Sequence, residues 1–169
     1  MYVPSDDTFL LADCIKQYSG RWALEIGVGS GLLLKMLEKN FANVAGSDID
    51  LKVLQHCRGK SEAMLACCDA ASAFTGMFDL IVSNPPYLPD DKVRDTTVHG
   101  GPAGIETTIQ FVRSALQNLA RGGRMLFVVS SLADSSALDQ LVGEKKMSKK
   151  VVMEKRVFFE TLSVIELGA

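Results

Sequence analysis

The residues Leu24-Glu25-Ile26-Gly27-Val28-Gly29-Ser30-Gly31 are the strongest indication of the fold of this chain. Apolar residues at positions 22–26 predict a buried strand, and the periodicity of residues 32–37 predicts a helix directly after the glycines. Glycines between a strand and a helix let the backbone approach a ligand closely, and they let the first helical N–H groups face it. The stretch therefore predicts a loop that binds a nucleoside cofactor at the end of this strand.

The spacing of the glycines argues against a dinucleotide as the ligand. Gly27, Gly29 and Gly31 follow the pattern Gly-x-Gly-x-Gly, whereas a dinucleotide fingerprint would place its third glycine at position 32, where this chain has Leu. An acidic residue, Glu25, also precedes the loop on the strand. We therefore expect a nucleoside cofactor other than a nicotinamide or flavin dinucleotide.

Strand-length apolar runs alternate with segments of helical periodicity along the rest of the chain. Strands are predicted at residues 22–26, 43–47, 64–68, 78–83 and 124–130, and helices at 32–37, 52–57, 109–119 and 137–142. This alternation is typical of a doubly wound α/β domain with a parallel sheet. Residues 150–159 and 161–167 are two further β-rich segments with almost nothing between them, so they predict an antiparallel hairpin at the end of a seven-stranded, mostly parallel sheet.

Length, composition and charge limit the classes of protein that fit this sequence. With 169 residues and 47% hydrophobic side chains, we expect a single domain over residues 1–169. The formal net charge is −2, and Lys and Arg are scattered apart from the cluster at residues 145–150. Direct binding to nucleic acid is therefore not expected, because such binding relies on many phosphate contacts.

The cysteines and the N-terminus point to an intracellular location. Cys14, Cys57, Cys67 and Cys68 contain no Cys-x-x-Cys spacing, so we predict reduced thiols and no metal site. No basic segment followed by a long apolar one begins the chain, and no run reaches the roughly 18 apolar residues of a membrane span. We expect a cytoplasmic protein.

Acidic residues follow the next two predicted strands. Asp48 ends the second strand, where a carboxylate can accept hydrogen bonds from ribose hydroxyls, and Asp69 follows the third. Asp50 is instead predicted to cap the following helix. Each aspartate could equally cap a turn, but ligands of open α/β sheets bind at the carboxyl ends of strands, so we favour a cofactor site.

The segment Asn84-Pro85-Pro86-Tyr87 follows the fourth predicted strand and suits a planar NH2 group. The lone pair of such a nitrogen is delocalised, so the nitrogen is activated best by acceptors that hold its two N–H bonds. The Asn84 side-chain oxygen and the Pro85 carbonyl can do this, and Tyr87 can stack on the planar group. Proline restricts both its own backbone and that of the preceding residue, which holds these carbonyls rigidly.

The alternative interpretation of this segment is an ordinary turn with two prolines. The long loop at residues 85–105 favours function, because loops of this length in compact domains are more often functional than accidental. His99 lies in that loop, but we do not expect it to be catalytic. We call the segment Asn84-Pro85-Pro86-Tyr87 the clamp. It indicates a planar amino acceptor and leaves open whether that acceptor is a glutamine, an adenine or a cytosine.

Five segments of the chain resemble the HemK-type protein glutamine methyltransferases, and specifically the short eukaryotic and archaeal branch that modifies class 1 release factors. These segments are residues 2–11, 27–31, 84–87, 100–106 and 160–164. The resemblance implies a Rossmann-like class I methyltransferase fold, with residues 1–20 packing over the cofactor site. It also implies N5-methylation of the glutamine in the Gly-Gly-Gln motif of a release factor, with S-adenosylmethionine (SAM) as the methyl donor and S-adenosylhomocysteine (SAH) as the product.

The same resemblance implies the residues of the site. Cofactor contacts are implied for Thr8, Glu25, Gly27, Gly29, Gly31, Asp48, Asp69, Ala70 and Asn84. Acceptor contacts and catalysis are implied for Asn84, Pro85 and Tyr87. No metal is implied.

Two features of the sequence suggest that the protein has a partner: a difference from the longer bacterial members of the family, and an apolar strand predicted at the sheet edge. The chain lacks the N-terminal helical domain with which longer bacterial members grip the release factor, so we expect something else to supply recognition. Residues 63–68 are apolar and uncharged, and the strand order that the resemblance implies puts them at the sheet edge, where another chain can pair with them. The resemblance implies a small zinc-binding activator protein at this edge, although a loop or helix of the same chain could cover it instead.

Two other functions remain open at this point. The same clamp could hold an adenine of DNA or RNA, which would require a flipped base and a basic path for the strand. The chain could also be a non-catalytic SAM-binding subunit of a complex, although the intact Asn84-Pro85-Pro86-Tyr87 segment argues against this interpretation.

Overall fold

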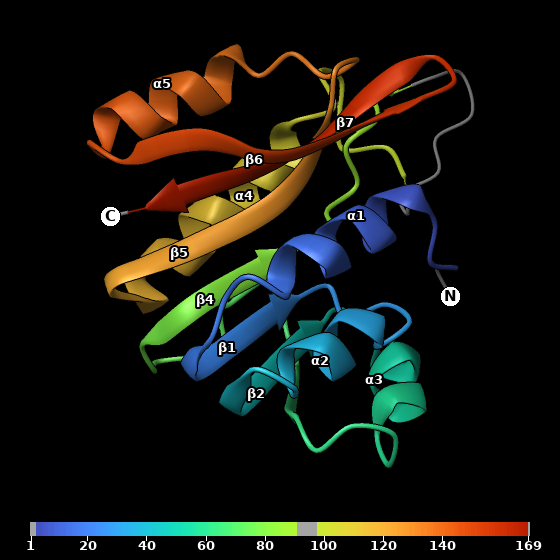
Figure 1. The fold of residues 1–169 in the computed structure, drawn as a ribbon, viewed down its shortest axis with the longest axis vertical. Helices are drawn as coiled ribbons and strands as arrows, with labels where there is room; N and C mark the ends of the chain where they lie inside the picture. The colour runs from blue at the N-terminus through green and yellow to red at the C-terminus, as the bar shows by residue number, and fades with distance from the viewer. Residues whose placement is uncertain (1–2, 91–97, 169) are drawn as a thin grey trace.

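The computed structural model describes residues 3–90 and 98–168 of the chain. Its centre is a seven-stranded sheet in the order β3-β2-β1-β4-β5-β7-β6 (Figure 1). The strands are β1 (Gly20–Ile26), β2 (Phe41–Asp48), β3 (Met64–Cys67), β4 (Phe78–Ser83), β5 (Leu119–Ser130), β6 (Ser148–Val157) and β7 (Glu160–Gly168). All neighbours pair in parallel except β7, which is antiparallel to both β5 and β6. The predicted doubly wound α/β fold with an antiparallel hairpin is confirmed.

Helices cover both faces of the sheet because its central strands are apolar on both sides. The helices are α1 (Asp6–Ile15), α2 (Leu32–Leu37), α3 (Leu51–Cys57), α4 (Glu106–Ala115) and α5 (Ser136–Glu144), with a short 3-10 turn η1 (Leu116–Asn118). In β4, Leu80 and Val82 pack with α1, α2 and α3, whereas Ile81 packs with α4 and α5. This alternation is the period of two residues that every strand imposes on its side chains.

The order of the strands reverses at β1 and β4. The chain moves outward from β1 to β2 and β3, and then returns to place β4 on the other side of β1. Ile26 is paired with Ser83, so Gly27 and Asn84 begin their loops side by side. Ligands of open α/β sheets bind in the crevice at this switch point.

One helix and two boundaries differ most from the sequence predictions. Helix α1 was not predicted; it forms because Leu11 and Ile15 bury one side against the sheet. Helix α4 ends at Ala115 rather than at residue 119, since Leu119 already pairs with Phe78 of β4. The hairpin strand that was predicted to reach residue 159 ends at Val157, and Phe158 and Phe159 form the turn.

No helix among the described residues is long and apolar enough to cross a bilayer.

Candidate functional site

The glycine loop leaves β1 with its backbone in the left-handed region. Gly27, Gly29 and Gly31 have φ angles of +77°, +48° and +77°. The N–H groups of Gly27 and Val28 both donate to the Ser47 carbonyl, at 2.8 and 3.1 Å, which holds the loop against β2. A side chain at Gly27 would have only Phe111 nearby, at 4.0 Å, so glycine is needed there for its backbone conformation.

Glu25 is a buried carboxyl directly beneath this loop. Its side chain is 2% exposed, and its Oε2 atom has no hydrogen-bond partner. Burial raises the pKa of this carboxyl well above its usual range; the nearby charge of Asp48 adds to the rise, and the backbone N–H of Leu34 opposes it. An unsatisfied buried oxygen is costly, so the site suits a ligand that brings an N–H or O–H donor.

Asp48 stands at the end of β2 and is already tied to the backbone on both sides. Its Oδ2 atom accepts from the N–H of Gly29 at 3.2 Å, and its Oδ1 atom accepts from the N–H of Asp50 at 2.9 Å. A carboxylate oxygen can accept a second hydrogen bond, so Asp48 is oriented and can still accept from hydroxyl groups. Asp50 caps α3 as predicted, because its Oδ1 atom accepts from the N–H of Lys52 at 2.8 Å.

Asp69 follows β3 and is held by a residue that the sequence did not indicate. Gln110 of α4 donates from Nε2 to both Asp69 oxygens at 3.1 Å. The next residue, Ala70, has a φ of +47°, and the N–H of Ala71 donates to the Ser114 hydroxyl at 3.1 Å. A non-glycine residue in this backbone region costs about 1–3 kcal/mol and persists where the surrounding structure fixes it. The turn after β3 is therefore built against α4.

Asn84 presents one satisfied and one unsatisfied side of its amide. Its Nδ2 atom donates to the Thr8 hydroxyl at 3.3 Å, whereas its buried Oδ1 atom has no partner. Thr8 is itself 4% exposed, and Pro85 is buried beside Asn84. The contact with Thr8 fixes the amide plane, and the remaining oxygen is an acceptor for an incoming N–H group.

Tyr87 is held by Asp7, which was not among the predicted site residues. The Tyr87 hydroxyl donates to Asp7 Oδ2 at 2.9 Å. Asp7 Oδ1 accepts from the Ser5 hydroxyl at 2.7 Å and from the Thr8 N–H at 2.6 Å, and the side chain is 4% exposed. The signal in the sequence was the segment of residues 2–11, which carries Asp7 beside Thr8. Residues 1 and 2 lie outside the described residues.

The loop after the clamp returns and packs on the clamp backbone. A Cβ at Gly100 would lie 2.3 Å from the Pro86 carbonyl oxygen, so only glycine permits this approach. Leu88 and His99 form an isolated bridge that closes the loop, of which residues 91–97 lie outside the described residues. The glycine-rich segment at residues 100–106 thus packs against the backbone of the clamp.

A pocket of about 270 Å³ adjoins the glycine loop on the side of α2 and α3. Its lining includes Pro4, Ser30, Gly31, Leu32, Lys35, Cys57, Lys60 and Ser61. Of the predicted cofactor residues, only Gly31 lines this pocket. In the part of the chain that the structure describes, no three His, Cys, Asp or Glu side chains are grouped to hold a metal ion.

The residues predicted from the sequence converge from separate parts of the chain. Thr8 lies on α1, Glu25 on β1, Asp48 at the end of β2, and Asn84 directly after β4. All of them except Thr8 lie at the carboxyl ends of neighbouring parallel strands. Thr8 joins them because its hydroxyl accepts a hydrogen bond from Asn84. The arrangement places two unsatisfied buried acceptors, Glu25 and Asn84, on either side of the switch point.

Comparisons with known proteins agree with this geometry. Residues 5–157 match the family model described as the methyltransferase small domain. A protein of Methanocaldococcus jannaschii, provisionally named a protein N5-glutamine methyltransferase, is 30% identical over 98% of this chain and 90% of its own length. The release factor glutamine methyltransferase of Bradyrhizobium diazoefficiens is 31% identical over 60% of this chain, which spans only 41% of that protein.

A solved structure shares the whole fold. It comes from E. cuniculi and is described as the Mtq2-Trm112 complex responsible for the methylation of the eRF1 translation termination factor. One chain of it matches 99% of this chain with a TM-score of 0.82 and 24% identity, and 97% of that chain is covered. The likeness confirms the predicted methyltransferase fold.

Proposed function

This chain belongs to the methyltransferase small domain family, and we propose that it transfers the methyl group of SAM to the side-chain nitrogen of a glutamine in a class 1 release factor. The observation that carries the proposal is the buried, unpartnered Oδ1 atom of Asn84 at the switch point. An acceptor oxygen in that position suits a substrate that arrives with N–H donors. A primary amide of a glutamine side chain brings two of them.

The residues present fit SAM as the methyl donor. The cofactor supplies a methyl group on a positively charged sulfur, which leaves as a neutral thioether. Glu25 offers an unsatisfied carboxyl oxygen to an amino group, and the oriented Asp48 carboxylate suits ribose hydroxyls. Asp69 and Ala70 would border the base, Gly27, Gly29 and Gly31 would let the backbone approach the ligand, and Thr8 would close the site from α1.

The clamp would activate the amide nitrogen by geometry. Asn84 Oδ1 and the Pro85 carbonyl would accept the two N–H bonds and draw the nitrogen toward a pyramidal shape, which localises its lone pair. Asp7 accepts the hydrogen bond of the Tyr87 hydroxyl, which restrains this side chain, and we propose that the ring of Tyr87 stacks on the planar amide. No strong base is required, because the proton can leave after transfer. We therefore assign no catalytic role to His99.

The acceptor is inferred from the names of the relatives. The archaeal and bacterial relatives are named as glutamine methyltransferases, and the bacterial one is named for a release factor. The E. cuniculi complex is described as acting on eRF1. We propose the glutamine of the Gly-Gly-Gln motif as the methylated residue, as the resemblance of the clamp and of residues 2–11 implies.

A small activator protein is proposed as the partner at β3. This strand forms one edge of the sheet and pairs only with β2 among the described residues. Met64 is 52% exposed and Cys67 is exposed, so neither is covered by a loop or helix of the described chain. An apolar, uncharged edge of this kind can pair with another chain. The E. cuniculi chain was solved with its partner Trm112, which supports a partner protein for this chain as well. We propose that the activator of this chain binds zinc.

The test is transfer of labelled methyl from SAM to the release factor of the same organism, with the small activator present. The controls are the release factor with its Gly-Gly-Gln glutamine changed to alanine, duplex DNA and single-stranded DNA. We expect label on the wild-type release factor alone. Asn84→Ala should lower the rate by about a hundredfold or more while SAM binding stays measurable, since a misplaced acceptor loses the reacting geometry. Label on DNA would overturn the choice of acceptor.

A further inference from the structure

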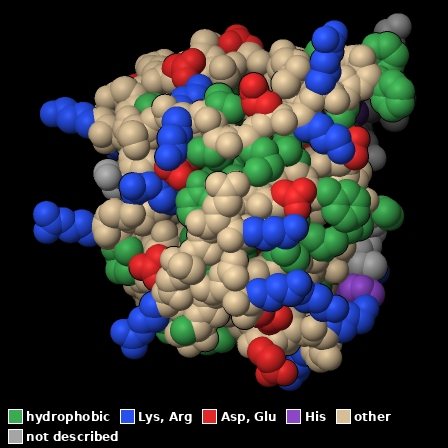
Figure 2. Space-filling model, in the orientation of Figure 1, with side chains coloured by type: hydrophobic (Ala, Val, Ile, Leu, Met, Phe, Trp, Pro, Cys, Tyr) green, Lys and Arg blue, Asp and Glu red, His purple; other side chains and the backbone are tan. Residues whose placement is uncertain are grey.

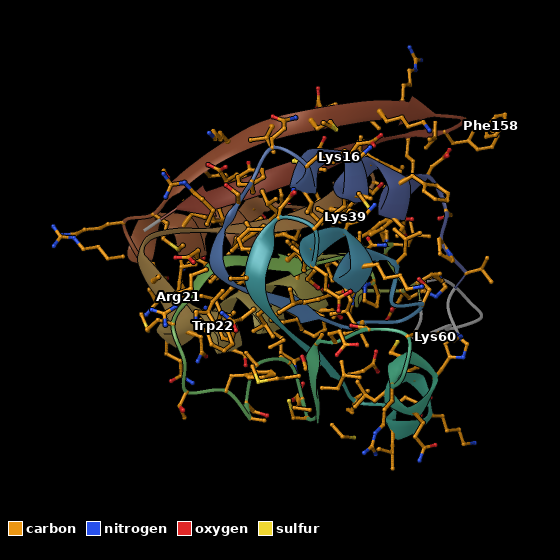
Figure 3. The ribbon with its side chains drawn as sticks, turned by 60° about the horizontal axis from the view of Figure 1, so that its bottom comes forward. Lys16, Arg21, Trp22, Lys39, Lys60 and Phe158 are labelled. Atoms are coloured by element: carbon orange, nitrogen blue, oxygen red, sulfur yellow. The ribbon has the colours of Figure 1, made fainter. Side chains whose placement is uncertain are left out.

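The turn between β6 and β7 exposes two phenylalanines almost completely. Phe158 is 98% exposed and Phe159 is 94% exposed, and their ring centroids lie 6.5 Å apart with the planes inclined by 40°. Phe158 projects from the outer end of the hairpin in Figure 3. Figure 2 shows hydrophobic side chains at the same upper right corner where Figure 1 places this turn. We call Arg156, Phe158 and Phe159 the hairpin tip.

The requirements of the turn do not explain these residues. Val157 pairs with Glu160, so Phe158 and Phe159 are the two residues of the loop. Two-residue hairpin loops favour Asn, Asp or Gly, which tolerate a positive φ, and neither phenylalanine adopts one. Two aromatic rings in water also gain nothing from burial in the folded chain. A binding role is the remaining physical reason for such residues at this position.

The hairpin tip lies at the same end of the sheet as the clamp, the end formed by the carboxyl ends of the parallel strands. Leu162 of β7 pairs with Ser130, the last residue of β5, so the turn extends beyond the carboxyl end of β5. Figure 3 shows the opposite end of the molecule at Arg21 and Trp22, where β1 begins. The parallel strands therefore all point toward the end that carries Phe158.

An ion pair connects the hairpin to the segment that holds Tyr87. Lys155 of β6 lies 3.0 Å from Asp6, which is the first residue of α1. The next residue, Asp7, accepts the hydrogen bond of the Tyr87 hydroxyl. A macromolecule whose side chain enters the clamp would thus have the hairpin tip within reach of its surface.

We propose that the hairpin tip is a docking surface for the body of the acceptor protein, which it holds while one glutamine enters the clamp. This inference rests on the proposed function. Aromatic residues and arginine are the residues most enriched among the energetic centres of protein interfaces, and Arg156, two residues before Phe158 in the chain, is exposed. The surface would fit an apolar patch bordered by carboxylates. A protein is favoured over a nucleic acid because the net charge of the chain is −2.

The test compares a whole acceptor with a short one. Wild type and the double variant Phe158→Ser, Phe159→Ser are assayed, with the activator, on the complete release factor and on a short peptide that carries the Gly-Gly-Gln motif. We expect KM for the release factor to rise by at least about tenfold in the variant, with kcat within about twofold, as for loss of aromatic interface anchors. Methylation of the peptide should be unchanged.

Val151→Ser is the matched control, because Val151 lies on β6, the strand that leads into the turn, and is also an exposed apolar residue, at 52%. This variant should methylate the release factor and the peptide as wild type does. A rise in KM for the release factor equal to that of the double variant would overturn the proposal. An equal loss on peptide and release factor would also overturn it, since the tip would then act on the clamp or the fold. So would a self-associating wild type that becomes monomeric in the double variant by sedimentation.

The wild-type enzyme separates this proposal from the proposed function. If wild type methylates the release factor and the double variant has the same KM, only the docking surface is wrong. If wild type labels DNA and no release factor, the proposed function is wrong, and the acceptor assigned to the hairpin tip is wrong with it.

Discussion

Two buried oxygens without partners, on Glu25 and Asn84, are the residue-scale features that define the site. Buried polar atoms in folded proteins nearly always find a hydrogen-bond partner. Five buried side-chain oxygens of the described residues lack one, and those of Glu25 and Asn84 lie at the carboxyl ends of neighbouring strands, where a bound ligand would complete them. Asp7 shows the opposite situation, a buried carboxylate that accepts from Ser5, Thr8 and Tyr87. We interpret Asp7 as a positioning residue that acts through Tyr87.

The first prediction concerns the hydrogen bond between Tyr87 and Asp7. Tyr87→Phe keeps the ring but removes the donor, and we expect kcat/KM for the release factor to fall by about tenfold, the usual effect of losing a bond to a charged group. Asp7→Asn should give a similar loss, and the double variant should be little worse than either single one. A double-mutant cycle measures this coupling, which should be about 1 kcal/mol. Simple additivity would show that Asp7 does not act through Tyr87.

The second prediction concerns the buried Glu25 carboxyl. Its pKa is raised in the folded protein from an ordinary value of 4.5, so above pH 4.5 the unfolded chain ionises while the folded chain resists ionisation. The contribution of Glu25 to stability is therefore present below pH 4.5 and is lost as pH rises toward the folded pKa. Glu25→Gln removes this loss, which amounts to about 1.4 kcal/mol for every tenfold difference in acid dissociation constant between the folded and unfolded chains.

Urea unfolding of the ligand-free protein between pH 5 and 8 measures the effect. The difference in free energy of unfolding, variant minus wild type, should grow with pH. A difference that stays constant over this range would mean that Glu25 ionises normally in the folded protein. SAH should bind the variant more weakly, because an amide replaces the carboxylate that we propose as the partner of its amino group.

Among the elements of the fold, the two edge strands of the sheet differ in charge. Strand β6 forms one edge and carries Lys149, Lys150, Lys155 and Arg156, and charged side chains of this kind discourage pairing with another chain. Strand β3 forms the other edge and reads Met64-Leu65-Ala66-Cys67, without a charge. The contrast supports β3, and not β6, as the place where a partner would add.

The third prediction uses the cysteines as reporters of that edge. At pH 8, iodoacetamide should react with the exposed Cys67 and spare the buried Cys14, because burial raises the pKa of the Cys14 thiol to about 11; the charge of Glu166 adds to this rise and the Tyr18 hydrogen bond opposes it. Binding of the activator to β3 should slow the reaction of Cys67 several-fold.

Mass spectrometry of labelled peptides assigns the rates, and Cys67→Ser identifies the fast site. Full labelling of Cys67 in a complex that gel filtration shows to be intact would place the partner elsewhere.

In the whole molecule, the fold brings the cofactor loop, the clamp and the N-terminal helix together at the carboxyl ends of the parallel strands. Asn84 and Thr8 are far apart in the chain and lie 3.3 Å apart in space, and Tyr87 and Asp7 are joined in the same way. The hairpin also contacts the N-terminal helix, because Lys155 of β6 forms an ion pair with Asp6. The first turn of α1 therefore connects the clamp after β4 with the edge strand β6 at the proposed acceptor site.

The alternation of strands and helices, the antiparallel hairpin, the glycine loop and the segment at residues 84–87 could all be predicted from the amino-acid sequence. These features depend on local rules: the period of apolar residues, the backbone freedom of Gly27, and the restriction that proline places on its neighbours. The helix cap at Asp50 was predicted for the same reason, since a cap involves residues close in the chain.

Which side chains come into contact could be learned only from the folded chain. The contacts of Asp7 with Tyr87 and of Gln110 with Asp69 join residues from distant elements, and no local pattern encodes such a pair. The same holds for the hairpin turn, where apolar Phe158 and Phe159 resembled strand residues until the register of β6 and β7 placed them beyond the last pair. Local periodicity sets each element, whereas packing sets register and proximity, and the site depends on both.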